Sequence, residues 1–116
     1  FNNYLCSKYA NNWIEICKLE DIVPDTGVCA LVNEKQVALF RTRNDDLFAI
    51  DNLDPFSNAN VLSRGIVGSL GEKLVVASPI YKQHFCLSTG QCLQEDDVRI
   101  KSYLVKEEAG KVKVAA

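Results

Sequence analysis

The chain has 116 residues, of which 47% are hydrophobic and 24% are charged, and its formal net charge is −2. These values are typical of one globular domain with a packed core, and they exclude a disordered or strongly basic protein, so we expect no nucleic-acid partner. No apolar run approaches the ~20 residues that cross a bilayer. The first residues also lack the basic and apolar regions of a signal peptide, so we expect a cytoplasmic protein without a membrane partner.

Short apolar segments separated by turn residues follow one another along the chain, and almost nothing repeats at the helical period. They predict strands at residues 13–19, 28–32, 36–42, 46–51, 66–69, 73–77, 84–87, 103–106 and 111–114. Residues 52–65 form a long irregular stretch. Short strands with frequent turns predict an all-β antiparallel sandwich or barrel, with residues 1–12 as an N-terminal extension and residues 13–116 as the single domain.

The five cysteines are an odd number and include no close Cys-x-x-Cys pair, which favours free thiols over a disulfide framework or a zinc site. Cys17 and Cys29 lie within apolar strand patterns, where a thiol serves as a small hydrophobe. We therefore expect all five thiols to be reduced, and these two to be largely buried.

His84, Cys86 and Cys92 have the spacing His-x-Cys-x5-Cys, which offers three candidate metal ligands. Strand alternation places His84 and Cys86 on one face, whereas Cys92 lies beyond the Thr89-Gly90 turn. A Cys86 nucleophile paired with His84 lacks a third group to orient the imidazole. We therefore favour a surface or structurally hydrogen-bonded His84 and expect no catalytic residue.

The most informative regions are two irregular segments, residues 51–59 and 78–90. The second contains Pro79, Phe85, Leu87 and a Thr89-Gly90 turn at the spacing found in the second cluster-binding loop of the Rieske family. Both segments resemble the loops of that family, which present Cys-x-His and Cys-x-x-His to a 2Fe-2S cluster. The resemblance implies a Rieske-type β domain.

This resemblance assigns the four ligand positions to Asp54, Phe56, Ser78 and Tyr81. Phe56 has no lone pair to donate, and the hydroxyl groups of Ser78 and Tyr81 do not replace a thiolate and an imidazole. Lys82 occupies a position that is usually glycine. We therefore expect no metal and no cofactor in this chain, and we expect Asp54 to tighten the turn before Pro55 through bonds to backbone amides.

Residues 51–65 and 76–85 are similar to the small subunit of the assimilatory NAD(P)H-dependent nitrite reductase, in which Asp-x-Phe usually replaces Cys-x-His. The resemblance implies a non-catalytic accessory subunit that docks on a large subunit carrying FAD, sirohaem and a 4Fe-4S cluster. That large subunit reduces nitrite to ammonia in nitrate assimilation. One alternative is a ferredoxin-like electron carrier of Rieske type with an unconventional metal site, and another is a free-standing regulatory module.

Six residues at the tip of the two loops are candidates for binding the partner: Pro55, Phe56, Arg64, Ile80, Tyr81 and Lys82. Apolar and aromatic groups that are exposed together indicate an interface. Alternatively, Phe56 and Tyr81 fold inward and fill the volume of the missing cluster. We expect Pro55 and Phe56 to lie against Ile80 and Tyr81, so that the two loops are bridged.

Overall fold

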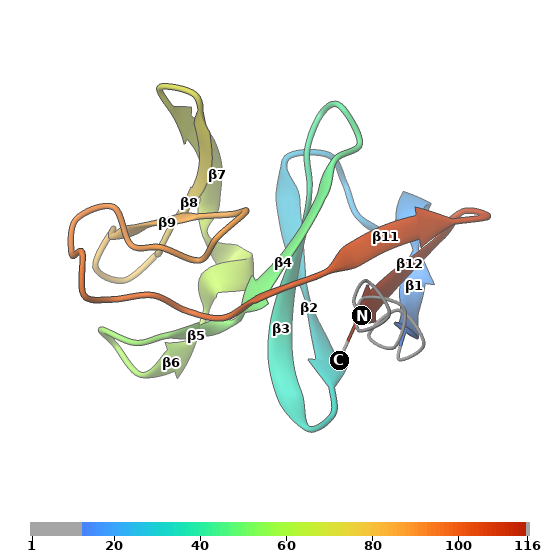
Figure 1. Ribbon diagram of the computed structural model, residues 1–116, viewed down its shortest axis with the longest axis horizontal. Helices are drawn as coiled ribbons and strands as arrows, with labels where there is room; N and C mark the ends of the chain where they lie inside the picture. Colours follow the sequence, from blue (N-terminus) through green and yellow to red (C-terminus); the bar gives the residue numbers. More distant parts are fainter. Residues whose placement is uncertain (1–12, 116) are drawn as a thin grey trace, which may run out of the picture.

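Figure 1 shows the computed structural model, which describes residues 13–115. Its regular elements are strands and two short 3-10 helices, and every strand pairing is antiparallel. In chain order they are β1 (Trp13–Lys18), η1 (Leu19–Asp21), β2 (Thr26–Val32), β3 (Lys35–Arg41), β4 (Leu47–Asp51), β5 (Leu53–Asp54), β6 (Ala59–Asn60), η2 (Leu62–Arg64), β7 (Ile66–Leu70), β8 (Lys73–Ala77), β9 (His84–Cys86), β10 (Ser102–Tyr103), β11 (Val105–Glu108) and β12 (Lys111–Ala115). The predicted all-β antiparallel fold is confirmed. Within residues 13–115, the helices are too short to span a membrane.

The central sheet has the strand order β10-β4-β3-β2, and both of its faces are covered. Successive side chains of a strand point to opposite faces. In β3, Val37 and Leu39 therefore enter one hydrophobic core, whereas Ala38 and Phe40 enter a second core on the opposite face. This double burial explains why β3 contains an uninterrupted apolar run.

The first core lies between the central sheet and a three-stranded sheet with the order β1-β12-β11. Val112 and Val114 of β12 are fully buried in it, and Ile14 and Ile16 of β1 pack against its margin. Strands β1 and β12 are paired in a register that makes Trp13 and Ala115 Cα partners. Both ends of the described chain therefore lie at one end of this sheet.

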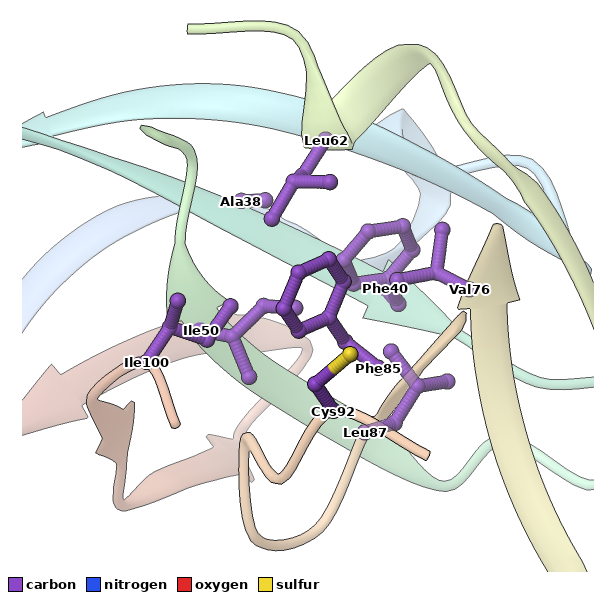
Figure 2. Close-up of a cluster of buried hydrophobic side chains, with 9 residues drawn as sticks. All are labelled: Ala38, Phe40, Ile50, Leu62, Val76, Phe85, Leu87, Cys92 and Ile100. Carbon is purple, nitrogen blue, oxygen red and sulfur yellow. The ribbon is translucent and has the colours of Figure 1, made fainter. Parts of the chain in front are cut away.

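The second core joins the other face of the central sheet to the sheet β7-β8-β9 and its loops (Figure 2). Its buried members are Ala38, Phe40, Ile50, Leu62, Val76, Phe85, Leu87, Cys92 and Ile100. Burial of each large apolar side chain stabilises the fold by roughly 1.5–3 kcal/mol. The loops that follow β4 and β8 are therefore anchored to a packed core.

One predicted strand is divided in the structure. The sequence predicts a single strand at residues 103–106, whereas β10 pairs with β4 in the central sheet and β11 pairs with β12 in the neighbouring sheet. Leu104 lies between them and is 63% exposed. The chain changes sheets at this residue, and a continuous strand pattern gives no sign of that change.

The prediction that Cys29 is buried is wrong, and Cys17 is half-buried. Cys29 lies on β2, an edge strand of the central sheet, where its side chain is exposed. Its thiol lies beside two polar groups, at 3.4 Å from Gln36 Oε1 and 3.5 Å from Asn52 Nδ2. The four cysteines within residues 13–115 are free, and Cys6 lies outside this range.

Candidate functional site

The candidate site consists of two loops at one end of the second core. The first loop follows β4 and contains the short β5-β6 hairpin, and the second loop connects β8 to β9. They lie together on the left of Figure 1, whereas β1 and β12 lie on the right. Both loops thus project from the side of the molecule that is remote from the ends of the described chain.

Asp54 organises the first loop. Its side chain is fully buried, and Oδ1 accepts a hydrogen bond from the Phe56 N–H at 2.9 Å. The Asp54 carbonyl also accepts a bond from the Asn58 N–H at 2.7 Å. The prediction that Asp54 tightens this turn through backbone amides is confirmed.

A hydrogen bond between buried side chains joins the two loops. The Ser78 hydroxyl donates to Asp54 Oδ2 at 2.5 Å, and both residues are 0% exposed. This distance is at the short end of the range for a hydroxyl bonded to a carboxylate. Two positions that the Rieske resemblance assigns to cluster ligands are therefore in direct contact with each other.

Ser78 also organises the second loop. Its Oγ accepts a hydrogen bond from the Ile80 N–H at 3.3 Å, while its backbone N–H donates to the Gln83 carbonyl at 2.9 Å. Its own carbonyl accepts from the Lys82 N–H at 3.1 Å. Lys82 has φ +67°, the left-handed conformation that glycine adopts most easily. The loop therefore retains a glycine-type backbone at a position where the residue is lysine.

Phe56 and Tyr81 have different surroundings. Phe56 is half-buried and packs against the second core, with its ring centroid 6.2 Å from that of Phe85 and a tilt of 45°. Tyr81 is 58% exposed and Ile80 is 44% exposed. Phe56 therefore folds inward, as one of the two alternatives predicts, whereas Tyr81 is exposed, as the other predicts. Contact of Pro55 and Phe56 with Ile80 and Tyr81 stays a prediction.

Four of the candidate partner residues are each exposed, as Tyr81 is: Pro55, Arg64, Ile80 and Lys82. Arg64 comes from η2, which Asn52 holds in place. The Asn52 side chain is buried, and its Oδ1 accepts a hydrogen bond from the Ser63 N–H at 2.7 Å, while its Nδ2 donates to Gln36 Oε1 at 3.1 Å. Sequence reasoning missed this role, because an asparagine before an irregular stretch is typical of a solvent-exposed turn.

The His84, Cys86 and Cys92 side chains do not converge on one point. His84 and Cys86 pair with Ala77 and Val75 and share a face of β9, whereas Cys92 pairs with Phe85 and enters the second core. Within residues 13–115, no three His, Cys, Asp or Glu side chains are grouped so that they could hold a metal ion. Gln94 bonds His84 twice, through its Nε2 at 3.0 Å from His84 Nδ1 and its Oε1 at 2.8 Å from the His84 backbone N. The expectation of a structurally hydrogen-bonded histidine is confirmed.

The thiol of Cys86 has a lowered pKa. Burial raises the pKa of its thiol, but hydrogen bonds with the side chains and backbones of Ser88 and Thr89 lower it by more, so that the pKa falls to about 7. The Cys86 Sγ lies 3.3 Å from Ser88 Oγ. These contacts stabilise a thiolate. Sequence reasoning missed this effect, because it depends on how the turn after β9 folds back.

The four assigned positions do not fit an iron–sulfur cluster. Asp54 and Ser78 bond to each other and carry no thiolate or imidazole, Phe56 carries no donor atom, and Tyr81 is 58% exposed. Rieske clusters need two thiolates and two imidazoles. No step that depends on such a cluster can be derived from these side chains.

Comparison with known proteins gives consistent results. The family model described as "Rieske-like [2Fe-2S] domain" matches residues 12–115. The NADH nitrite reductase small subunit of Escherichia coli K12 is 45% identical over 105 residues, which cover 90% of this chain and 97% of that protein. The crystal structure of a putative NADH-dependent nitrite reductase small subunit from Mycobacterium tuberculosis superimposes with a TM-score of 0.86 at 40% identity, covering 90% of this chain and 94% of that one.

A third relative has a different organisation. The nitrite reductase [NAD(P)H] large subunit of Klebsiella oxytoca is 43% identical over 100 residues, which cover 86% of this chain but only 10% of that protein. The domain therefore also occurs as a small part of a much longer chain.

Proposed function

Because the chain belongs to the family of Rieske-like domains and, within it, to the small subunits of NADH nitrite reductase, we propose that it is a cytoplasmic docking subunit without a cluster. It binds the large subunit and supports the reduction of nitrite to ammonia there, while FAD, sirohaem and the 4Fe-4S cluster belong to the large subunit. This chain supplies no catalytic residue. Its contribution to the complex is a folded surface that binds the large subunit.

The observation that carries this proposal is the buried hydrogen bond between Asp54 and Ser78. It joins the two loops at 2.5 Å, where the resemblance places one cluster ligand on each loop. Metal ligation normally contributes folding energy to such loops. Here a direct side-chain bond and the packing of Phe56 on Phe85 hold the same loops without a metal.

The Klebsiella oxytoca relative supports the choice of partner. A domain 43% identical to this chain occupies 10% of a protein whose name is that of a large subunit. A covalent link keeps two folded units at a high effective concentration. Units that are linked in one protein and separate in another are expected to associate.

The exposed tip of the loops is the proposed contact surface, and its residues are Pro55, Arg64, Ile80, Tyr81 and Lys82. It combines apolar, aromatic and cationic side chains, and such a mixture is typical of interface centres with a polar rim. Phe56 packs on the second core, and we expect it to support this surface.

The test is to purify the large subunit with and without this chain and to measure association and nitrite-dependent oxidation of NADH. We expect co-purification, and higher turnover when the chain is present. A large subunit that neither binds the chain nor responds to it would contradict the proposal. An absorption spectrum of the iron-reconstituted chain tests the alternative, because a visible charge-transfer band would indicate an electron carrier.

A further inference from the structure

Strand β7 is an open edge of the sheet β7-β8-β9, and it projects with β8 as a hairpin at the top of Figure 1. Among the described residues it pairs with β8 alone, and four of its five residues are exposed. Its sequence, Ile-Val-Gly-Ser-Leu, contains no charge and no proline, and its register with β8 has no bulge. Charges, prolines and bulges are the features that normally protect an edge strand from pairing. The edge of β7 is therefore ready to accept another strand.

The direction of the backbone groups of β7 follows from its partners. The carbonyl of Leu74 in β8 accepts a hydrogen bond from the Leu87 N–H at 2.9 Å. The backbone N–H and C=O groups of Leu74 therefore point away from β7. Residues of an antiparallel pair alternate between hydrogen-bonded and non-hydrogen-bonded positions. Ser69 is the partner of Leu74, and Val67 is the partner of Val76. Ser69 and Val67 therefore direct their N–H and C=O groups to the open edge.

Gly68 has no role that the free chain explains. Its φ is not in the left-handed region, where the glycines at positions 71, 90 and 110 are found. A Cβ atom added to it would meet nothing within 4 Å. Glycine within a strand weakens the strand, and it often marks a place where another backbone or a ligand approaches closely. Within residues 13–115, neither conformation nor packing requires glycine here.

The neighbours of Gly68 on the same face of the strand leave space for a large side chain between them. Ile66 and Leu70 lie two residues to either side, and they are 72% and 47% exposed. The cross-strand partner of Gly68, Val75, is 3% exposed. On this face of the sheet, the side chain from β8 is therefore buried, whereas the side chains from β7 are exposed. A notch flanked by two exposed aliphatic side chains remains on β7.

The edge of β7 is continuous with the proposed contact surface. Ile66 is the Cα partner of Ala77, which directly precedes Ser78 in the second loop. Arg64 precedes Ile66 by two residues. A partner that covers the loops therefore reaches the start of β7.

We propose that an extended strand of the large subunit pairs with the open edge of β7 and places a bulky apolar side chain over Gly68, between Ile66 and Leu70. This inference rests on the proposed function, because it takes the large subunit as the partner. A large side chain that packs over an edge glycine compensates for the missing side chain. A second copy of this chain paired along the full strand would instead set glycine against glycine, and the notch would stay empty.

The test compares three variants in their binding to the intact large subunit. Gly68→Val fills the notch, and Ile66→Lys places a charge beside it. Leu31→Lys is the matched control, because Leu31 is 70% exposed on the edge strand β2. We expect the first two variants to weaken binding by at least about tenfold, as for central interface residues, and the control to bind like the wild type. Gly68→Val should melt at the wild-type temperature or higher, because a Cβ atom there meets open space.

Hydrogen exchange of the complex provides the second readout. The amides of Val67 and Ser69 should become protected when the large subunit binds. Wild-type binding by both β7 variants, with no new protection of these two amides, would overturn the inference and leave the proposed function intact. Failure of the wild-type chain to bind the large subunit would overturn both. A free chain that forms dimers, which Ile66→Lys dissociates, would assign the edge to a second copy and overturn the choice of partner.

Discussion

The two aromatic side chains at predicted ligand positions have opposite surroundings. Phe56 is half-buried against Phe85, whereas Tyr81 is 58% exposed. A buried ring contributes to the folding free energy, while an exposed ring at an interface contributes to binding. The two residues therefore separate the fold of the loops from their proposed contact surface.

Phe56→Ala should lower the free energy of unfolding by about 1–3 kcal/mol, because it removes a ring that is half-buried in the second core. Tyr81→Ala should change stability by less than about 0.5 kcal/mol. It should weaken binding of the large subunit by about tenfold. Urea unfolding and a binding titration measure these effects. If both substitutions leave stability and binding unchanged, the loops are not the packed docking surface proposed here.

Lys82 is strained by its φ of +67°. Lys82→Gly should raise the free energy of unfolding by about 0.5–1 kcal/mol, because glycine adopts this conformation without a Cβ clash. Lys82→Ala retains the strain and is the control that removes only the charged chain. Equal stability of the two variants would show that the backbone of the loop is not under this constraint.

The lowered pKa of the Cys86 thiol predicts that the free energy of unfolding depends on pH. Its pKa is lowered from 9.0 to about 7 in the folded chain, so the folded state favours the thiolate. The resulting stabilisation is fully present above the unfolded pKa and is lost as the pH falls through 7. The difference in unfolding free energy between the wild type and Cys86→Ser should therefore grow from pH 6 to pH 9. A constant difference over this range would contradict the lowered pKa.

At the scale of elements, three buried polar side chains hold the two loops in place. Asp54 and Ser78 join loop to loop, and Asn52 joins the first loop to β3 and η2. A buried polar group that loses its partner keeps the cost of desolvation. The loops should therefore depend on each partner of the Asp54–Ser78 bond.

Ser78→Ala should lower the free energy of unfolding by about 1–3 kcal/mol, because the buried Asp54 carboxyl loses a donor. Asp54→Ala should cost a similar amount. The double variant should cost less than the sum of the two, and this coupling is measured in a double-mutant cycle by chemical unfolding. Strictly additive effects would mean that the bond does not hold the loops.

Sequence patterns located most of the strands, because alternation and turn residues are local signals. Strand β8 begins and ends as predicted, and β1 and β12 differ by one residue. The division of residues 103–106 between two sheets was not predictable, because it depends on which strands lie beside them. The exposure of Cys29 has the same cause, since its edge position is a property of the assembled sheet.

The site was predicted in part. The loops and the turn at Asp54 followed from the residues themselves. The inward position of Phe56 and the outward position of Tyr81 did not, because both are aromatic residues in irregular segments. The bond from Ser78 to Asp54 joins residues 24 positions apart in sequence. Only the folded chain brings them together.

At the scale of the molecule, the central sheet lies between two cores and separates the ends of the described residues, 13–115, from the loops. Trp13 and Ala115 are Cα partners at the edge of the first core, whereas the loops extend from the second. Figure 1 shows β1 and β12 on the opposite side from β5, β6 and β9.

The most direct test of a docking subunit without a cluster is to bind the iron-free chain to the large subunit. The chain is purified with a chelator, its iron content is measured by mass spectrometry, and it is titrated into the large subunit while nitrite-dependent NADH oxidation is followed. We predict that the iron-free chain binds and supports turnover as well as the untreated chain. Binding or turnover that appears only after reconstitution with iron and sulfide would contradict the account.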